Sequence, residues 1–150
     1  MRFFADILDT VRRRGPVVHC ITNYVTVNDC ANMILAAGGS PIMADDIAEV
    51  EDVVALAQAL VINIGTLNSR TVEAMLVAGQ RANSLGRPVV LDPVGAGATA
   101  LRNSALQSLL REVRFAVIKG NISEIGFLAG EDARARGVDA EDASLVTEGS

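Results

Sequence analysis

Side chains that can bind a metal ion or a phosphate stand where two short apolar runs of the sequence stop. The runs cover residues 88–91 and 115–118, and the side chains that follow them are Asp92, Lys119, Asn121 and Glu124. The runs have the β-branched and aliphatic composition of buried parallel strands, and open parallel sheets bind ligands at the carboxyl ends of their strands. We therefore expect two carboxylates, a cation and an amide at one sheet edge, a set that suits a nucleotide with Mg²⁺ better than a protein core.

Asn121 and Glu124 also have a purely structural interpretation. An Asn at a helix N-cap, with a Glu at the third helical position, forms a capping box that stabilises the helix by about 1 kcal/mol. However, Lys119 lies just before this pair, and the first turn of a helix offers free backbone N–H groups to an anion. These features favour a phosphate or metal site over a cap alone.

Asp92 precedes Pro93 and a loop that contains Gly95 and Gly97. An Asp before Pro can be a simple turn residue, but the two glycines allow the backbone to approach a ligand closely. The loop also matches the loose dinucleotide-binding pattern GxGxxG/A. Because the next apolar run ends in Lys119 rather than in an acidic residue, the sequence disfavours a nicotinamide or flavin site.

Apolar runs alternate with helical patterns along the whole chain. Strands are expected at residues 17–21, 40–43, 60–64, 89–91 and 115–118. Successive strands that are joined by helices form a parallel sheet with right-handed crossovers, so the strands all end at the same edge. The residues expected there are Asn23, Met43, Gly65, Thr66, Asp92, Lys119, Asn121 and Glu124. The sequence thus predicts an α/β fold in a single domain, residues 1–150, of which residues 131–150 form a polar tail or the start of a missing half.

Two of the predicted helices have distinctive patterns. The N-terminal helix is amphipathic, with an apolar stripe made of Phe4, Ile7, Leu8 and Val11. A later helix is expected to begin with a capping box formed by Asp46 and Glu49. The residues that this helix is expected to turn inward are Ile47, Val50, Val53, Val54 and Ala57.

The composition limits the classes of function. The chain has 150 residues, half of them apolar, so it can build an aliphatic core. A net charge of −5 argues against non-specific nucleic-acid binding, and no apolar run is long enough to span a membrane. Cys20 and Cys30 are interpreted as two buried free thiols of a reducing compartment. We expect a cytoplasmic protein.

Three single residues have both a structural and a functional interpretation. His19 lies within an apolar run and is better explained as a core residue than as a catalytic one. Asn23 is placed to orient a small polar ligand, whereas Asn28 and Asn32 are expected to be solvated or to cap a helix. Met43 fits a core position, or an apolar pocket in which its thioether contacts a heterocycle.

Five motifs in unbroken order, between about residue 7 and residue 130, carry a resemblance to a known family. They are His19-Cys-Ile-Thr-Asn23, Pro41-Ile-Met-Ala44, Asn63-Ile-Gly65-Thr66, Leu91-Asp-Pro-Val-Gly-Ala-Gly-Ala-Thr99 and Lys119-Gly-Asn-Ile-Ser-Glu-Ile125. Together they resemble hydroxyethylthiazole kinases, thiamine-salvage enzymes of the ribokinase-like superfamily. The resemblance implies a three-layer α/β/α fold with a mainly parallel sheet, and phosphorylation by ATP of the hydroxyl of 4-methyl-5-(2-hydroxyethyl)thiazole.

The resemblance also implies roles for particular residues. Met43, Asn23 and Gly65 would bind the thiazole alcohol. Lys119 and Asn121 would bind ATP, with Lys119 at a position where the family often has Arg. Asp92 and Glu124 would hold Mg²⁺, partly through water. The expected assembly is a trimer with sites between subunits, and no partner is expected among nucleic acids or membranes.

Family members are longer, and their second halves carry a glycine-rich anion hole, a Thr on the adenine side and a catalytic Cys in a Gly-Cys motif. Nothing in this sequence matches those features, so no catalytic residue is assigned, and the chain is expected to be an N-terminal portion with poor turnover alone. The alternatives are another ribokinase-like small-alcohol kinase, a nucleotide-dependent dehydratase, an inactive remnant that acts by subunit association, and a flavodoxin-like electron carrier.

Overall fold

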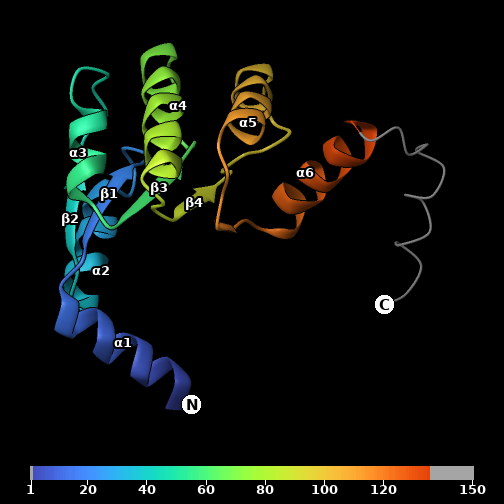
Figure 1. Ribbon diagram of the computed structural model, residues 1–150. Helices are drawn as coiled ribbons and strands as arrows, with labels where there is room; N and C mark the ends of the chain where they lie inside the picture. Colours follow the sequence, from blue (N-terminus) through green and yellow to red (C-terminus); the bar gives the residue numbers. More distant parts are fainter. Residues whose placement is uncertain (1, 136–150) are drawn as a thin grey trace.

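The computed structural model describes residues 2–135, in which strands and helices alternate (Figure 1). The strands are β1 (Val17–Ile21), β2 (Ser40–Met43), β3 (Ala59–Asn63), β4 (Val89–Asp92) and β5 (Val117–Ile118). The helices are α1 (Arg2–Arg14), α2 (Val27–Ala37), α3 (Val50–Leu56), α4 (Ser69–Ser84), α5 (Ala100–Glu112) and α6 (Ile122–Ala135). Most of the polar tail expected at residues 131–150 lies outside the described residues.

The five strands form one parallel sheet in the order β2-β1-β3-β4-β5. The predicted α/β fold with strands that end at a common edge is therefore confirmed. The chain moves outward in one direction from β1 to β2 and in the other direction from β3 to β5, so the strand order reverses between β1 and β3. Such a switch point opens a crevice at the carboxyl ends of the strands.

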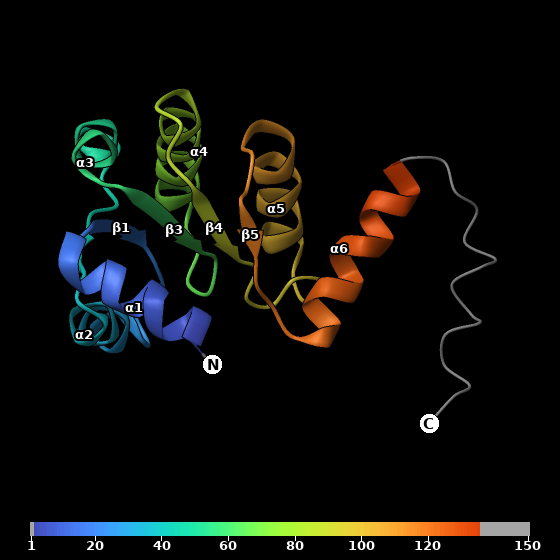
Figure 2. The same ribbon diagram turned by 60° about the horizontal axis from the view of Figure 1, so that its bottom comes forward.

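Helices cover both faces of the sheet and form three layers. Figure 2 shows α3, α4 and α5 along one face, and α1 and α2 on the other, beside β1. Helix α6 leaves the sheet beyond β5 (Figures 1 and 2). Within residues 2–135, no helix has both the length and the apolar character to cross a membrane.

The core is aliphatic, as the composition predicts. It lies between the sheet and α3, α4 and α5, where alternate residues of β3 and β4 are fully buried: Leu60, Ile62, Val89 and Leu91. Burying a side chain of this size stabilises a fold by about 1.5–3 kcal/mol. The opposite residues of these strands, Val61 and Val90, are only partly buried.

The predicted start of α3 is wrong. The helix begins at Val50, and Glu49 occupies the N-cap position without a side-chain capping bond. Asp46 instead accepts the backbone N–H of Ala48 at 2.9 Å and holds a turn before the helix. As a result Ile47 lies outside the helix and is exposed, while the other residues expected to face inward are buried.

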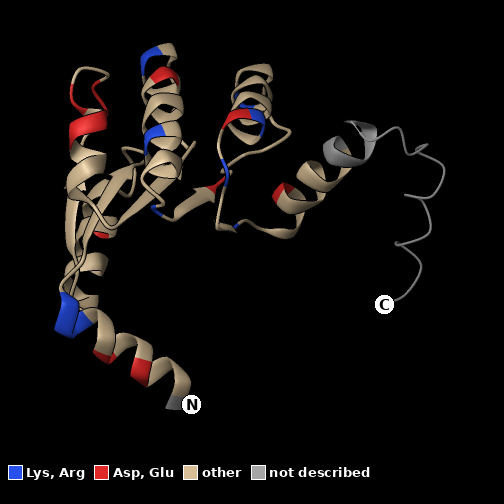
Figure 3. Ribbon diagram, viewed as in Figure 1, with Lys and Arg blue, Asp and Glu red and all other residues tan. Residues whose placement is uncertain are grey.

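The amphipathic pattern of α1 is correct, but its apolar stripe is not covered. Phe4 is 75% exposed, and Ile7 and Leu8 are also exposed. Three arginines occupy its last turn, where the helix dipole favours cations (Figure 3). Of the two free thiols, Cys20 in β1 is buried, but Cys30 in α2 is only half-buried, so the expectation of two buried thiols holds for one of them.

Candidate functional site

A line of hydrogen-bonded side chains runs along the carboxyl edge of the sheet, across four neighbouring strands. After β1, Nδ2 of Asn23 donates to Oδ1 of Asn63, the last residue of β3, at 3.0 Å. Nδ2 of Asn63 donates to Oδ2 of Asp92, the last residue of β4, at 3.0 Å. Just after β5, Nζ of Lys119 reaches the same oxygen at 2.9 Å. The edge therefore brings together Asn23, Asp92 and Lys119, as expected from the sequence.

Asp92 and Lys119 form an ion pair that is open to solvent on one side. The Asp92 side chain is 19% exposed and the Lys119 side chain is 71% exposed. Because both hydrogen-bond donors given above reach Oδ2, Oδ1 of Asp92 remains for a ligand. The arrangement offers a carboxylate oxygen beside an exposed positive charge, which suits a hydrated cation bound to a phosphate.

Glu124 forms a capping box with Asn121 at the start of α6. This is the structural interpretation given above for the two residues. Oε2 of Glu124 accepts the backbone N–H of Asn121 at 2.8 Å, and the Asn121 side chain accepts the backbone N–H of Glu124 at 2.9 Å. Its Oε1 accepts the backbone N–H of Gly95 at 3.0 Å. These two hydrogen bonds hold the pKa of Glu124 below its usual value, and the bond from Gly95 has the larger effect, followed by that from Asn121. Glu124 thus stays ionised and fastens the β4–α5 loop to α6.

The loop after Asp92 depends on glycine. Gly95 and Gly97 have φ of +71° and +86°, in the left-handed region that side chains rarely adopt. A Cβ on Gly97 would also lie 2.9 Å from the Phe127 ring. The backbone N–H of Gly97 is held by Oδ1 of Asn103 at 2.9 Å. The two glycines therefore let the β4–α5 loop turn tightly and pack closely against α6.

The alcohol-binding residues expected from the sequence lie at the switch point between β1 and β3. Oδ1 of Asn23 accepts the backbone N–H groups of Val25 and Thr26, both at 3.0 Å, which fixes the turn after β1. Gly65 packs against this turn, since a Cβ there would lie 2.8 Å from Cβ of Asn23. The carbonyl of Gly65 accepts Nη2 of Arg102 at 2.7 Å.

Met43 ends β2, one strand beyond Asn23, and is half-buried. Beside it, Nε2 of His19 lies 2.7 Å from the carbonyl oxygen of Ala44. A carbonyl oxygen can only accept, so Nε2 carries the proton. Burial lowers the pKa of His19, and no residue among those described pairs with its Nδ1. The interpretation of His19 as a core residue is correct.

Asn63 and Arg102 lie at this edge without a role predicted from the sequence, although Asn63 begins one of the five motifs. Asn63 follows the same rule that identified Asp92, since it is a polar residue at the end of an apolar run. Arg102 gave no such signal, because it lies in the first turn of α5 and reaches Gly65 only through the fold.

No group of three or more His, Cys, Asp and Glu side chains suited to a metal ion occurs among the residues that the structure describes. A divalent ion at this edge would therefore need ligands from water and phosphate in addition to the carboxylates, as Mg²⁺ commonly has.

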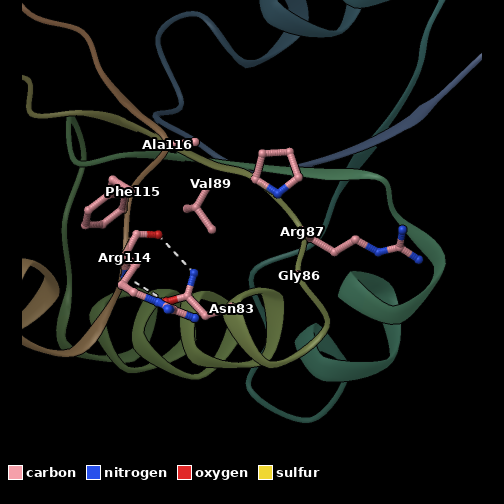
Figure 4. A pocket seen from close by; sticks show the side chains of 8 residues that line it. Asn83, Gly86, Arg87, Val89, Arg114, Phe115 and Ala116 are labelled. Atoms are coloured by element: carbon pink, nitrogen blue, oxygen red, sulfur yellow. Dashed lines mark hydrogen bonds between the residues drawn. The ribbon is translucent and has the colours of Figure 1, made fainter.

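A pocket of about 320 Å³ lies at the opposite, amino edge of the sheet. Its lining includes Asn83, Arg87 and Arg114 (Figure 4). The Asn83 side chain is paired with the backbone of Arg114, accepting its N–H at 2.7 Å and donating to its carbonyl at 2.9 Å. The Arg87 side chain points away from both (Figure 4). These groups do not converge on a common point, so the carboxyl edge is the better candidate site.

Comparison with known proteins gives a consistent result. The sequence model of the hydroxyethylthiazole kinase family matches residues 8–148. A hydroxyethylthiazole kinase of Desulfovibrio desulfuricans is 84% identical over 99% of this chain and 52% of its own length. One of Alkaliphilus oremlandii is 55% identical over 93% of this chain and 51% of its own length.

A solved structure of a hydroxyethylthiazole kinase from Pyrococcus horikoshii superposes with a TM-score of 0.83 at 48% identity. The superposition covers 91% of this chain and 54% of that one. The chain thus spans about half the length of the relatives it matches.

Proposed function

Because the chain belongs to the hydroxyethylthiazole kinase family, and so has a ribokinase-like α/β/α fold, we propose that its carboxyl edge forms part of a kinase site. The reaction is transfer of the γ-phosphoryl group of ATP to the hydroxyl of hydroxyethylthiazole, which gives thiazole phosphate for thiamine biosynthesis. One observation carries the proposal: the hydrogen-bonded line from Asn23 through Asp92 to Lys119 joins the expected alcohol-binding end to the expected phosphate-binding end.

The residues at the phosphate end fit a nucleotide with Mg²⁺. Oδ1 of Asp92 is the oxygen that remains for a metal-bound water, and Glu124 stays ionised near the same loop. Bound Mg²⁺ would neutralise phosphate charge. Lys119 would place its ammonium group against a phosphate oxygen, and Asn121 would support it at the start of α6. Catalysis of phosphoryl transfer consists mostly of such positioning and charge neutralisation.

The residues at the alcohol end would orient the acceptor. Asn23 and the backbone of Gly65 would hold the hydroxyethyl arm, and Met43 would contact the thiazole ring. Met43 lies on the outermost strand, so a site formed between subunits of a trimer fits its place in the sheet. We place the protein in the cytoplasm, where its two free thiols stay reduced.

Isothermal titration of Mg²⁺ with a non-hydrolysable ATP analogue tests the proposal without requiring turnover. Asp92→Asn should weaken binding of the Mg-nucleotide by about 10–100-fold, because it removes the charge that faces the cation. Asp29→Asn makes the same change at an exposed position of α2 and should leave binding unchanged. Equal affinities for wild type and Asp92→Asn would contradict the metal role.

Mass spectrometry of the products from a panel of small alcohols with Mg-ATP separates hydroxyethylthiazole from other acceptors. A full-length relative is assayed in parallel. Preferred phosphorylation of a different alcohol would replace the thiazole in the proposal while keeping the kinase reaction.

A further inference from the structure

Asn63 is a buried polar residue to which neither the family resemblance nor the proposed roles assign a task. It is the last residue of β3, is only 8% exposed and lies where the strand order reverses. In the sheet register it pairs with Asp92. Its side chain therefore stands between the residues proposed for the alcohol and the residue proposed for the metal.

The amide of Asn63 forms hydrogen bonds on both sides. Oδ1 accepts two N–H groups, from Nδ2 of Asn23 at 3.0 Å and from the backbone of Gly65 at 2.9 Å. Nδ2 donates to Oδ2 of Asp92 at 3.0 Å. A rotated amide would place its NH₂ group against the N–H of Gly65 and its oxygen against a carboxylate, so one orientation alone satisfies all three neighbours.

No other side chain of similar size could make these three contacts. An Asp at this position would set a second carboxylate about one hydrogen-bond length from Asp92. A Leu would leave the N–H of Gly65 and the amide of Asn23 without their acceptor, and buried polar groups without partners are costly. The combination of two donors on one side and an acceptor on the other selects Asn.

We propose that Asn63 is a positioning residue that couples the alcohol end of the site to the metal end. Because one amide contacts both sides, a metal ion that binds Asp92 also fixes the turns at Asn23 and Gly65. In the other direction, an alcohol bound at those turns fixes the position of Asp92. This inference rests on the proposed function for the identity of the two ligands. The inference predicts cooperative binding: each ligand raises the affinity for the other by the same factor, since a coupling between two sites acts equally in both directions.

The first test examines the hydrogen-bonded line by itself. In ¹H–¹⁵N spectra, Asp92→Ala should shift the side-chain amide signals of Asn63 and also those of Asn23, which does not touch Asp92. Asn32→Asp, an exposed change in α2, should leave both unchanged. Unmoved Asn23 signals in Asp92→Ala would overturn the coupling, whatever the protein binds.

The second test measures cooperativity. The dissociation constant of hydroxyethylthiazole is determined with and without the Mg-nucleotide analogue, and the ratio gives the coupling factor. Asn63→Leu should reduce this factor toward one while each ligand still binds separately, and Asn32→Leu should preserve it. Asn63→Ser, which cannot span both sides, should give the same loss if Asn63→Leu fails to fold.

The outcomes separate the inference from the proposed function. An undiminished coupling factor in both Asn63 variants, or no coupling in the wild type, overturns the inference alone. If the wild-type chain binds neither ligand, the proposed function and the coupling both fail.

Discussion

At the scale of single residues, both carboxylate oxygens of Glu124 accept backbone N–H groups, from Gly95 and from Asn121. The lowered pKa that follows means that folding favours the ionised form. This stabilisation is complete above the unfolded-state value of about 4.5 and is lost as the pH falls through the lower, folded-state pKa.

Glu124→Gln should therefore reduce the free energy of unfolding at pH 7, because the amide NH₂ cannot accept an N–H group. The difference from wild type should shrink as the pH falls from about 4.5, where the carboxyl of the unfolded chain takes up a proton, through the lower pKa of the folded protein. Urea unfolding at a series of pH values measures it. Glu73→Gln, exposed on α4, serves as the control, and a difference that persists at low pH would contradict the hydrogen-bonding role.

His19 makes a second pH prediction, in a higher pH range. Its buried, neutral ring has a lowered pKa, so the unfolded chain takes up a proton more readily. Stability should fall as the pH drops below the ordinary value of about 6.5.

His19→Gln keeps a donor for the carbonyl of Ala44 and should remove this dependence of stability on pH. His19→Leu leaves that buried carbonyl unpaired and should lower stability by about 1–3 kcal/mol at pH 8. Equal stability of the two variants would contradict the hydrogen bond.

At the scale of elements, close packing of α4 against the chain just after α5 depends on Gly79. A Cβ at Gly79 would lie 2.5 Å from a methyl carbon of Val113, and both residues are buried. Gly79→Ala should be destabilising, because overpacking costs about 1–3 kcal/mol and exceeds the gain of about 1 kcal/mol in helix propensity. Gly126→Ala, in α6 with nothing near the added Cβ, should instead be neutral or stabilising. Thermal unfolding of both variants measures this, and matching melting temperatures would contradict the packing.

The sequence predicts elements well where periodicity decides them and poorly where packing does. Strands β1 and β2 have the predicted bounds, since Gly39 precedes β2 and the polar residues Thr22 and Asn23 follow β1. The start of α3 was mispredicted because Asp46 can cap either a helix or a turn, and the backbone beyond β2 favours the turn. β5 is shorter than predicted, because only Val117 and Ile118 pair with β4.

At the scale of the whole molecule, the parallel sheet gathers residues from distant segments at one edge. The sequence could predict Asp92, Lys119 and Asn23 there, because each follows an apolar run and parallel strands end together. It could not predict that Asn63 joins them, since that depends on β3 lying between β1 and β4. Strand order is a property of the fold and is not contained in local patterns.

The most direct test of the account is a binding map of the ¹⁵N-labelled chain by NMR. With Mg-nucleotide and hydroxyethylthiazole, backbone amide shifts should concentrate in residues 23–26, 63–66, 92–97 and 119–124, at the carboxyl edge of the sheet. Residues 86–88 and 114–116, at the amino edge, should stay unchanged. Shifts centred on the amino-edge pocket, or no shifts with either ligand, would contradict the claim that the carboxyl edge is the site.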